Sequence, residues 1–371
     1  MRIGIDAGPI LGDRGGVGWH TYHLLKALLD LKEDVEWVCY LPPGAHNRDD
    51  GALAELGAGG ESRLRWVEAG RPTMRWRGRL DRLDLYHGPN FKMRTTGRYG
   101  GVVTVHDLWL DRYPQYSTKF FGQRASFYRT RRTAHRARRV ITVSDYSARD
   151  IESLYGLSRD RIVVIPNGVS DDFRPSAGAT DLAGLRSRFS IPTERFLLFV
   201  GGADPRKNHR ALLKAYALRA DRLSGHCLVL VGDVTHRFGD LRETARTLGV
   251  ERRTVCTGRL PLQDLRLLYS CAEAFVFPSI YEGFGMPVLE AMACGAPVIT
   301  ANRTSLPEVA GDAAILVDPE DAGQLGEAIV QVVEDPALRA SLKAKGFDRV
   351  KQFTWERTAR RTLALYQELC S

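Results

Sequence analysis

The stretch AFVFPSIYEGFGMPVLEAMACGAPVIT, residues 274–300, reads as a single strand–loop–helix–strand unit. A short apolar strand over 274–277 runs into a glycine-containing loop, and the helix that follows ends at Gly295, before a second short strand over 297–300. Two short apolar strands joined through a helix predict a parallel pair inside a sheet that helices cover on both faces.

The same alternation runs along most of the 371 residues. It predicts further strands near residues 3–6, 37–41, 83–85, 102–106, 140–143, 162–165, 196–200, 227–231, 254–257 and 314–317, and helices near 20–29, 211–218, 262–270, 322–333 and 337–350. The pattern breaks once, in the polar segment 170–193, which contains Pro175, Gly178 and Pro192. We therefore predict an α/β protein of two Rossmann-like, doubly wound parallel-sheet domains, over about 1–172 and 188–352, that face each other across a cleft.

Composition limits the class of protein. Hydrophobic residues make up 44% and charged residues 26% of the chain, as in an ordinary globular protein. No apolar run approaches the roughly 18 residues that cross a bilayer, and the start, MRIGIDAGPI, reads as a first strand rather than a signal peptide. The six cysteines show no C-x-x-C spacing, which predicts reduced thiols and neither a zinc site nor disulfides. We expect a cytoplasmic protein, and its net charge of +9 favours anionic partners.

Two basic residues stand where a helix is expected to begin. In DPRKN, residues 204–208, Asp204 is expected to cap a helix that Pro205 opens. Arg206 and Lys207 then fall in its first turn, where the helix dipole disfavours cations. A bound diphosphate would resolve that conflict, and two solvated surface cations are the alternative interpretation.

The first half of the chain gives weaker signals. The sequence GGVG at 15–18 lies between the first strand and the first helix, where glycines allow a phosphate or sugar to approach the backbone, although most such loops are only turns. His106 and Asp107 end the strand near 102–106, at the sheet edge where α/β proteins bind ligands, and a structural histidine is the alternative. The segment YHGPN at 86–90 is similar and weaker.

The loop and helix start YEGFGMPVLE, residues 281–290, carry the strongest signal. Glu282 lies in the loop beside the amides of Phe284 and Gly285, and Glu290 lies one turn into an otherwise apolar helix. A carboxylate there is costly unless it is hydrogen-bonded, and ligand hydroxyls are suitable partners. The alternatives are an exposed loop acid at Glu282 and a favourable first-turn carboxylate at Glu290.

This E-x7-E pattern resembles the hallmark of the family 4 retaining glycosyltransferases of GT-B fold. The resemblance runs nearly end to end and also includes the segments 15–18, 106–107, 143–147 (VSDYS), 164–169 (VIPNGV), 205–208 (PRKN), 277–279 (FPS), 305–309 (SLPEV) and 353–356 (FTWE). It implies that the first domain binds the acceptor and the second the nucleotide sugar. It also implies that the terminal helix, 353–371, crosses back onto the first domain.

The resemblance further implies a role for each matched residue. Glu290 would bind the donor ribose, and Glu282 would hold the transferred sugar. Arg206 and Lys207 would neutralise the diphosphate, and His106 would contact the sugar. The implied catalytic set is His106, Arg206, Lys207 and Glu282, and the implied donor-binding set is Gly15, Gly16, Gly202, Arg206, Lys207, Arg259, Leu260, Glu282, Gly283, Phe284, Gly285 and Glu290. Many members place the phosphate-binding arginine in a G-R-L segment, which here reads GGA at 201–203.

The PRKN variant resembles mannosyltransferase-like members that build bacterial surface polysaccharides, which favours GDP-mannose as the donor. We expect no metal and no cofactor, because no D-x-D motif is well placed and Arg206 with Lys207 can stabilise the charge that develops on the diphosphate. No carboxylate obviously serves as a nucleophile, so the expected mechanism is the family's retaining front-side substitution, in which the leaving phosphate assists the acceptor.

Two basic segments suggest where the acceptor comes from. The segment from Lys119 to Arg139 holds eight Lys or Arg and no acid, and residues 71–82 hold five Arg. Both contain interleaved apolar side chains: Phe120, Phe121, Phe127 and Tyr128 in the first, Met74 and Trp76 in the second. Such helices read as peripheral contacts with an anionic membrane surface, here its inner face, which fits a glycan or lipid-linked glycan acceptor. A core-packed aromatic stripe with a solvated basic face is an equal alternative, and no nucleic-acid motif accompanies the charge.

Other activities would suit the same architecture. A GT-B epimerase would turn over a nucleotide sugar without an acceptor, and a phosphorylase would need free phosphate. A non-catalytic protein would bind a nucleotide sugar or an anionic polymer without turnover. The complete motif set favours an active transferase.

Overall fold

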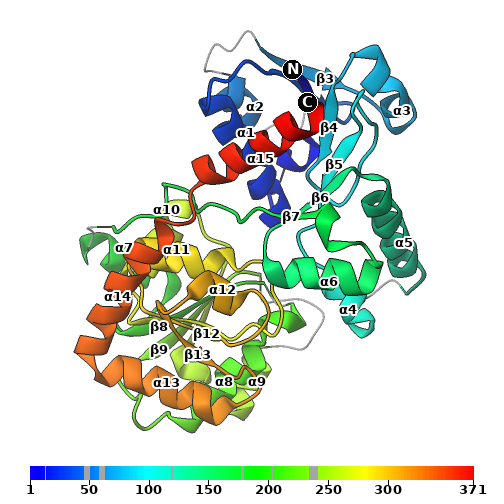
Figure 1. Cartoon of the computed structure of the whole chain (residues 1–371). Coiled ribbons are helices and arrows are strands. Elements are labelled where there is room, and N and C mark those ends of the chain that lie inside the picture. Colours follow the sequence, from blue (N-terminus) through cyan, green and yellow to red (C-terminus); the bar gives the residue numbers. More distant parts are fainter. Residues whose placement is uncertain are drawn as a thin grey trace. The chain divides into compact units, whose positions relative to one another are not determined.

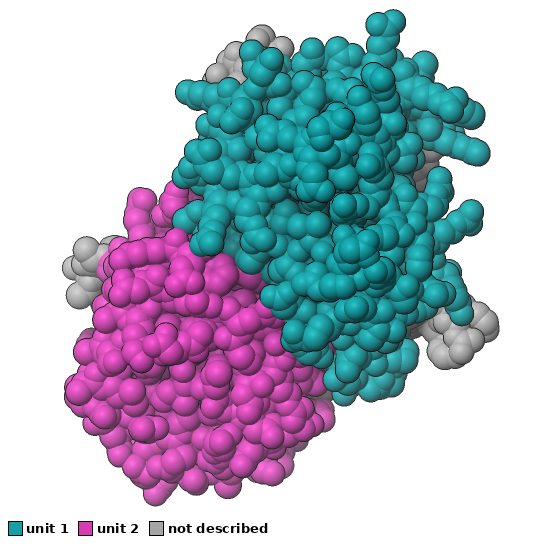
Figure 2. Space-filling view, viewed as in Figure 1, with its two compact units in different colours: residues 1–168, 354–371 teal, residues 169–353 magenta. Residues whose placement is uncertain are grey.

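The computed structural model describes residues 1–12, 14–45, 51–57, 63–117, 120–176, 179–202, 204–233 and 241–371. The chain forms two compact units, whose elements are labelled in Figure 1. Unit 1 comprises residues 1–168 and 354–371, and unit 2 comprises residues 169–353 (Figure 2).

Unit 1 is built on a parallel sheet that has seven strands in its described residues, in the order β3-β2-β1-β4-β5-β6-β7. The strands are β1 (Arg2–Asp6), β2 (Glu36–Leu41), β3 (Leu64–Glu68), β4 (Leu85–Gly88), β5 (Gly101–Thr104), β6 (Arg139–Thr142) and β7 (Ile162–Val164). Its helices are α1 (Gly16–Asp30), α2 (Ala52–Gly57), α3 (Arg71–Leu80), α4 (Trp109–Arg112), α5 (Phe120–Arg136), α6 (Asp145–Tyr155) and α15 (Trp355–Cys370). Strand β3 was missed from the sequence because it is a half-exposed edge strand with charged residues and no continuous apolar run.

The last helix of the chain, α15, belongs to unit 1. It packs against α1, and the two helices lie side by side in Figure 1. Thr358 Oγ1 of α15 donates a hydrogen bond of 2.7 Å to the carbonyl oxygen of Pro166, and the Tyr366 hydroxyl of the same helix lies 2.5 Å from Nδ1 of His87 in β4. Residues from the two ends of the sequence therefore share one core.

Unit 2 repeats the architecture, with six parallel strands in its described residues in the order β10-β9-β8-β11-β12-β13. The strands are β8 (Phe196–Val200), β9 (Cys227–Val231), β10 (Thr254–Gly258), β11 (Ala274–Phe277), β12 (Val298–Ala301) and β13 (Ala314–Val317). The helices are α7 (Ala179–Phe189), α8 (His209–Leu218), α9 (Leu241–Thr247), α10 (Leu262–Cys271), α11 (Met286–Cys294), α12 (Leu306–Ala310), α13 (Ala322–Glu334) and α14 (Pro336–Val350). The quoted stretch 274–300 forms β11, α11 and most of β12, as predicted.

The segment 170–193, where we expected the connection between the two domains, lies in unit 2 and contains α7. Arg188 of α7 forms an ion pair with Asp264 of α10, and the backbone N–H of Ser176 donates to Ser270 Oγ at 3.0 Å. Proline and glycine near its ends made the segment read as a linker, whereas these contacts hold it against α10. The units consequently divide at 168/169 and 353/354 rather than across 173–187.

Each sheet reverses its strand order once. In unit 1 the reversal lies between β1 and β4, and in unit 2 between β8 and β11, since the chain runs outward from β1 or β8 in one direction and then resumes on the other side. Loops that leave the carboxyl ends of such a pair diverge, which opens a place for ligands. Within the described residues, no helix combines the length and apolarity that a membrane span requires.

Candidate functional site

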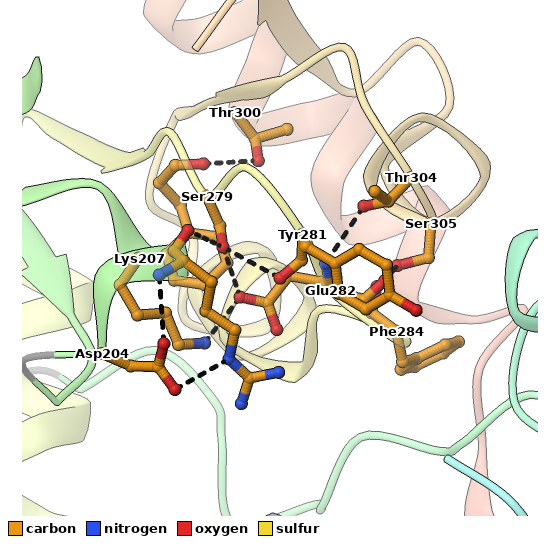
Figure 3. Close-up of polar contacts among 11 residues, drawn as sticks. Asp204, Lys207, Ser279, Tyr281, Glu282, Phe284, Thr300, Thr304 and Ser305 are labelled. Atoms are coloured by element: carbon orange, nitrogen blue, oxygen red, sulfur yellow. Dashed lines mark hydrogen bonds and ion pairs between the residues drawn. The ribbon is translucent and has the colours of Figure 1, made fainter. Parts of the chain in front are cut away.

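In unit 2, the predicted site residues gather at the strand reversal. Strand β8 leads through Gly202 to a single 3-10 turn over Pro205–Lys207, and β11 leads to the loop that carries Glu282. Lys207 Nζ lies 2.6 Å from Glu282 Oε1, and the two side chains are only 13% and 8% exposed (Figure 3). The structure thus joins two residues that are 75 positions apart in the sequence.

Several contacts hold Glu282 and its partner Lys207 in place. Ser279 Oγ lies 2.7 Å from Glu282 Oε1, and the backbone N–H of Glu282 donates to Thr304 Oγ1 at 3.1 Å. Lys207 Nζ also lies 4.8 Å from the centre of the Phe277 ring, a cation–π contact. Both side-chain contacts of the carboxylate end on Oε1, and Oε2 forms no hydrogen bond within the described residues. Oε2 is therefore positioned to accept a hydrogen bond from a ligand hydroxyl.

Burial and charge oppose each other in this ion pair. Burial lowers the pKa of Lys207 below its ordinary value, and the Glu282 carboxylate offsets this only in part. Burial acts to raise the pKa of Glu282, but the charges of Lys207 and Arg206 and the hydrogen bonds outweigh it, so that this pKa is lowered. The pair is held in its charged form because each group neutralises the other in a site that water barely reaches.

Arg206 stands beside this pair. Its backbone N–H donates to Asp204 Oδ1 at 3.0 Å, which confirms the predicted cap, and its Nε lies 3.3 Å from Asp204 Oδ2. The expected helix start is wrong in one respect: the capped turn is a separate 3-10 turn, and α8 begins only at His209. The two cations therefore precede the main helix rather than opening it.

Asn208 explains that break, and sequence analysis gave it no role. Its backbone is left-handed, with φ of 59°, and its Nδ2 donates to the carbonyl oxygens of Pro278 at 3.2 Å and Pro319 at 2.7 Å. It thereby ties the loops after β8, β11 and β13 together. The sequence signal would have been an Asn, which tolerates positive φ, directly after two cations at a predicted helix start.

Glu290 occupies a different environment. It lies in the second turn of α11, and the buried Tyr269 hydroxyl of α10 donates to its Oε2 at 3.1 Å. Burial raises the pKa of Glu290 to about 7, although Tyr269 and Lys207 pull it back. A carboxyl group that is half ionised at neutral pH suits a partner that supplies hydroxyl donors.

The remaining predicted donor-site residues of unit 2 lie at the same edge of the sheet. Gly283 and Phe284 are buried, and Gly285 adopts φ of 109°, where a side chain would be strained and would also approach Leu306 at 2.7 Å. Arg259 and Leu260 follow β10, and Arg259 is exposed. Of the GGA segment at 201–203, Ala203 lies outside the described residues.

The other predicted residues belong to unit 1. Gly15 caps α1 and Gly16 begins it, so the expected loop is shorter than predicted; both are exposed, and a Cβ at either would meet nothing within 4 Å. His106 is buried, with Nε2 2.8 Å from the Pro89 carbonyl oxygen, and burial lowers its pKa. His87, indicated more weakly by the sequence, is structural, since both of its ring nitrogens already have partners, Tyr366 and Thr104. The roles of Gly15, Gly16 and His106 toward a donor remain predictions.

No group of three or more His, Cys, Asp or Glu side chains in the described ranges is arranged to hold a metal ion. The implied nucleotide sugar is a substrate, and the residues present fit its parts: two cations for the diphosphate, and two carboxylates with free or weakly held oxygens for hydroxyls. The arrangement is therefore suited to bind a polyhydroxylated anion.

Comparisons with known proteins agree with this geometry. The family models "Glycosyltransferase Family 4" and "Glycosyl transferases group 1" match residues 14–173 and 185–349. O-antigen chain mannosyltransferase B of Escherichia coli is 35% identical over 295 residues, which cover 77% of this chain and 74% of that protein. The serotype-specific mannosyltransferase WbdA of Escherichia coli is 32% identical over 269 residues. The matched region covers 70% of this chain but only 32% of WbdA.

Among solved structures, Anabaena Alr3699/HepE in complex with UDP and glucose superposes with a TM-score of 0.76 at 19% identity, over 99% of this chain and 100% of that one. Two Rossmann-like units of this kind are the GT-B fold. The sheet architecture, the site at the strand reversal of unit 2 and these matches lead to one conclusion: the chain belongs to glycosyltransferase family 4, and it is a glycosyltransferase of GT-B fold.

Proposed function

We propose that this enzyme transfers a hexose, with mannose favoured, from a nucleoside diphosphate sugar to a glycan or lipid-linked glycan, with retention at the anomeric carbon. The observation that carries the proposal is the buried Lys207–Glu282 pair beside Arg206 at the strand reversal of unit 2. The choice of mannose, and of GDP-mannose as donor, is supported by relatives that are named as mannosyltransferases.

The proposed chemistry follows from the charges. Breaking the bond between the sugar and the diphosphate places negative charge on the leaving group, and preorganised cations in a water-poor site stabilise that charge more than the ground state. Lys207 stays protonated because Glu282 opposes the effect of burial on its pKa. Arg206 adds a second cation, and Glu282 Oε2 accepts a hydroxyl of the transferred sugar.

Glu290 would bind the ribose. Its Oε2 is held by Tyr269, and its other oxygen forms no hydrogen bond within the described part of the chain. This leaves the carboxylate to accept from a ribose hydroxyl. His106 of unit 1 is proposed to contact the transferred sugar as a neutral imidazole, since burial holds its pKa below the ordinary value.

A thermal-shift panel tests the donor assignment. The full chain is heated with GDP, UDP, ADP and their sugar conjugates in EDTA, with Glu290→Ala as the matched variant. We expect GDP and GDP-mannose to stabilise the wild type and the variant to lose most of that shift. Stabilisation by UDP alone would mean that the donor carries uracil rather than guanine. A shift that requires added metal would overturn the metal-independent mechanism. No shift with any nucleotide would overturn the donor site.

Product analysis tests the reaction itself. With GDP-mannose and a mannose-terminated acceptor, an NMR time course should show an α-linked product from the α-linked donor, through front-side attack assisted by the leaving phosphate. An inverted product would refute retention. Turnover without acceptor would indicate an epimerase, and dependence on free phosphate would indicate a phosphorylase.

Membrane contact through the basic segments remains a proposal. On α3, Trp76 and Leu80 are 55% and 70% exposed, whereas Met74, the other apolar residue named in this segment, is buried in the core at 1%. On α5, Tyr128 is 61% exposed, and Phe127 packs against Tyr155. Lys119 and the side chains of Phe120 and Phe121 lie outside the described residues. Sedimentation with anionic and neutral vesicles should show binding to anionic lipid only, which Trp76→Ala weakens; equal sedimentation with both lipids would exclude the proposal.

A further inference from the structure

Unit 1 contains a pocket of about 400 Å³ that none of the implied catalytic or donor-binding residues lines, although Asn90 belongs to the weakly indicated segment 86–90. It opens where β1, β2 and β4 end, and Asp6 is the last residue of β1. These strands include β1 and β4, between which the sheet of unit 1 reverses, so the pocket occupies the position where α/β sheets bind ligands. Its lining includes Asp6, Tyr40, Ala69, Met74, Asn90 and Arg94.

An ion pair lies in the wall of the pocket. Arg94 Nε donates to Asp6 Oδ2 at 2.7 Å, and the backbone N–H of Gly8 donates to Asp6 Oδ1 at 3.2 Å. The Asp6 side chain is 10% exposed and that of Arg94 is 35% exposed. The terminal amino groups of Arg94 form no hydrogen bond within the described residues, so the guanidinium still offers donors at the pocket surface. Asp6 in turn is held in place from two sides.

The rest of the lining adds polar and apolar surface. Asn90 also lines the pocket, and its side-chain amide forms no hydrogen bond with any residue that the structure describes. Pro9, Pro42 and Pro43, together with Met74 and Ala69, supply apolar surface. A few fixed polar groups set in an apolar wall are typical of a small-molecule site.

We propose that this pocket binds a neutral pyranose residue of the acceptor, with Asp6, Arg94 and Asn90 recognising its hydroxyls. The Asp6–Arg94 pair has no net charge, and this favours a neutral ligand. Arg94 is already neutralised by Asp6, so a phosphate or carboxylate would meet the Asp6 charge at close range. Sugar hydroxyls both donate and accept, so one hydroxyl can donate to Asp6 while its neighbour accepts from Arg94 or Asn90. The pyranose ring has C–H groups to place against the proline and methionine wall.

This inference rests on the proposed transfer reaction, but its test does not depend on turnover. The probe is methyl α-D-mannopyranoside, and its binding to the full chain with GDP present is followed by saturation-transfer NMR and competition. Arg94→Met and Asp6→Asn remove the two charges, and Asn90→Ala removes the amide without touching the ion pair. Asp145→Asn, which breaks the exposed pair with Arg159 elsewhere in unit 1, is the matched control.

We expect the dissociation constant for the mannoside to rise about 10- to 100-fold in Arg94→Met and about 10-fold in Asn90→Ala, as for the loss of charged and neutral hydrogen bonds. The GDP-induced thermal shift should stay unchanged in both, as should mannoside binding in Asp145→Asn. Asn90→Ala keeps the test decisive if the ion-pair variants do not fold.

Three results would overturn the inference. In the first, the wild type binds GDP but not the mannoside. In the second, the pocket variants bind the mannoside as well as the wild type does, and in the third, inorganic phosphate displaces the mannoside. Each leaves the donor site in unit 2 standing, whereas loss of the GDP shift in the wild type would instead refute the proposed function.

Discussion

Breaking the buried Lys207–Glu282 ion pair of unit 2 should lower the stability of the protein by an amount that depends on pH. Lys207→Met removes the cation and keeps an unbranched apolar side chain, leaving Glu282 only 8% exposed and without its partner. The carboxyl group escapes the resulting charge burial by taking up a proton. At pH 7, protonating a group with an ordinary pKa of 4.5 costs about 3.4 kcal/mol, which limits the loss of stability from this source.

Stability should depend on pH with opposite signs in the wild type and in Lys207→Met. In the wild type the pKa of Glu282 is lowered, so the stability it contributes is present above pH 4.5 and is lost only on further acidification. In Lys207→Met the pKa should instead be raised, so the folded state binds more protons and stability falls as the pH rises. At pH 5 the protonation cost is about 0.7 kcal/mol, so the defect should shrink by about 2.7 kcal/mol between pH 7 and pH 5.

Glu282→Gln should behave in the opposite way. It leaves Lys207 buried without its carboxylate partner. Deprotonating this lysine from an ordinary pKa of 10.5 costs about 4.8 kcal/mol at pH 7 and about 2 kcal/mol at pH 9. That defect should therefore ease as the pH rises. The double variant carries neither group and should show no such pH dependence.

Urea unfolding followed by far-UV circular dichroism at pH 5, 7 and 9 provides the measurement. All six tryptophans lie in unit 1, so tryptophan fluorescence reports on that unit and serves as an internal check. Lys351→Met is the control, because its ion pair with Asp348 is exposed and should contribute little at any pH. A Lys207→Met defect of the same size at pH 5 and pH 7 would refute the reasoning.

Three further predictions concern single residues. Burial lowers the pKa of His87 to about 3, so it contributes stability above pH 6.5 that is lost on acidification, about 2 kcal/mol by pH 5; His87→Gln should flatten the acid limb of the tryptophan-fluorescence stability curve, and an unchanged slope would contradict this. Because the pKa of Glu290 is raised to about 7, GDP affinity measured by calorimetry should increase about tenfold from pH 6 to pH 8, and Glu290→Gln should abolish that dependence. Asn208→Gly keeps the left-handed backbone but loses both amide hydrogen bonds, for a loss of about 2 kcal/mol; Asn208→Ala should cost about 1 kcal/mol more, and equal losses would mean that φ is unimportant.

Much of the fold was predictable because the signal is local. Parallel strands that are covered on both faces must be apolar along their whole length, and β8, β9 and β11 show this in the sequence as short apolar runs. Edge strand β3 lacked that signal because it is half-exposed, and helix α7 was missed because it lies in a polar segment between Gly178 and Pro192. The sequence also singled out Lys207, Glu282 and Glu290 as candidate site residues, because each belongs to a contiguous motif with a fixed spacing.

The sequence by itself determined the alternation of strands and helices, the two-unit plan and the family, because each is recorded in local periodicity or in contiguous motifs. Only the tertiary structure decided which of these residues meet. The strand order placed Lys207 against Glu282, and it put Asp6 beside Arg94, 88 positions away. No local pattern encodes such pairs, because side chains at strand ends become neighbours only through the order in which the strands assemble.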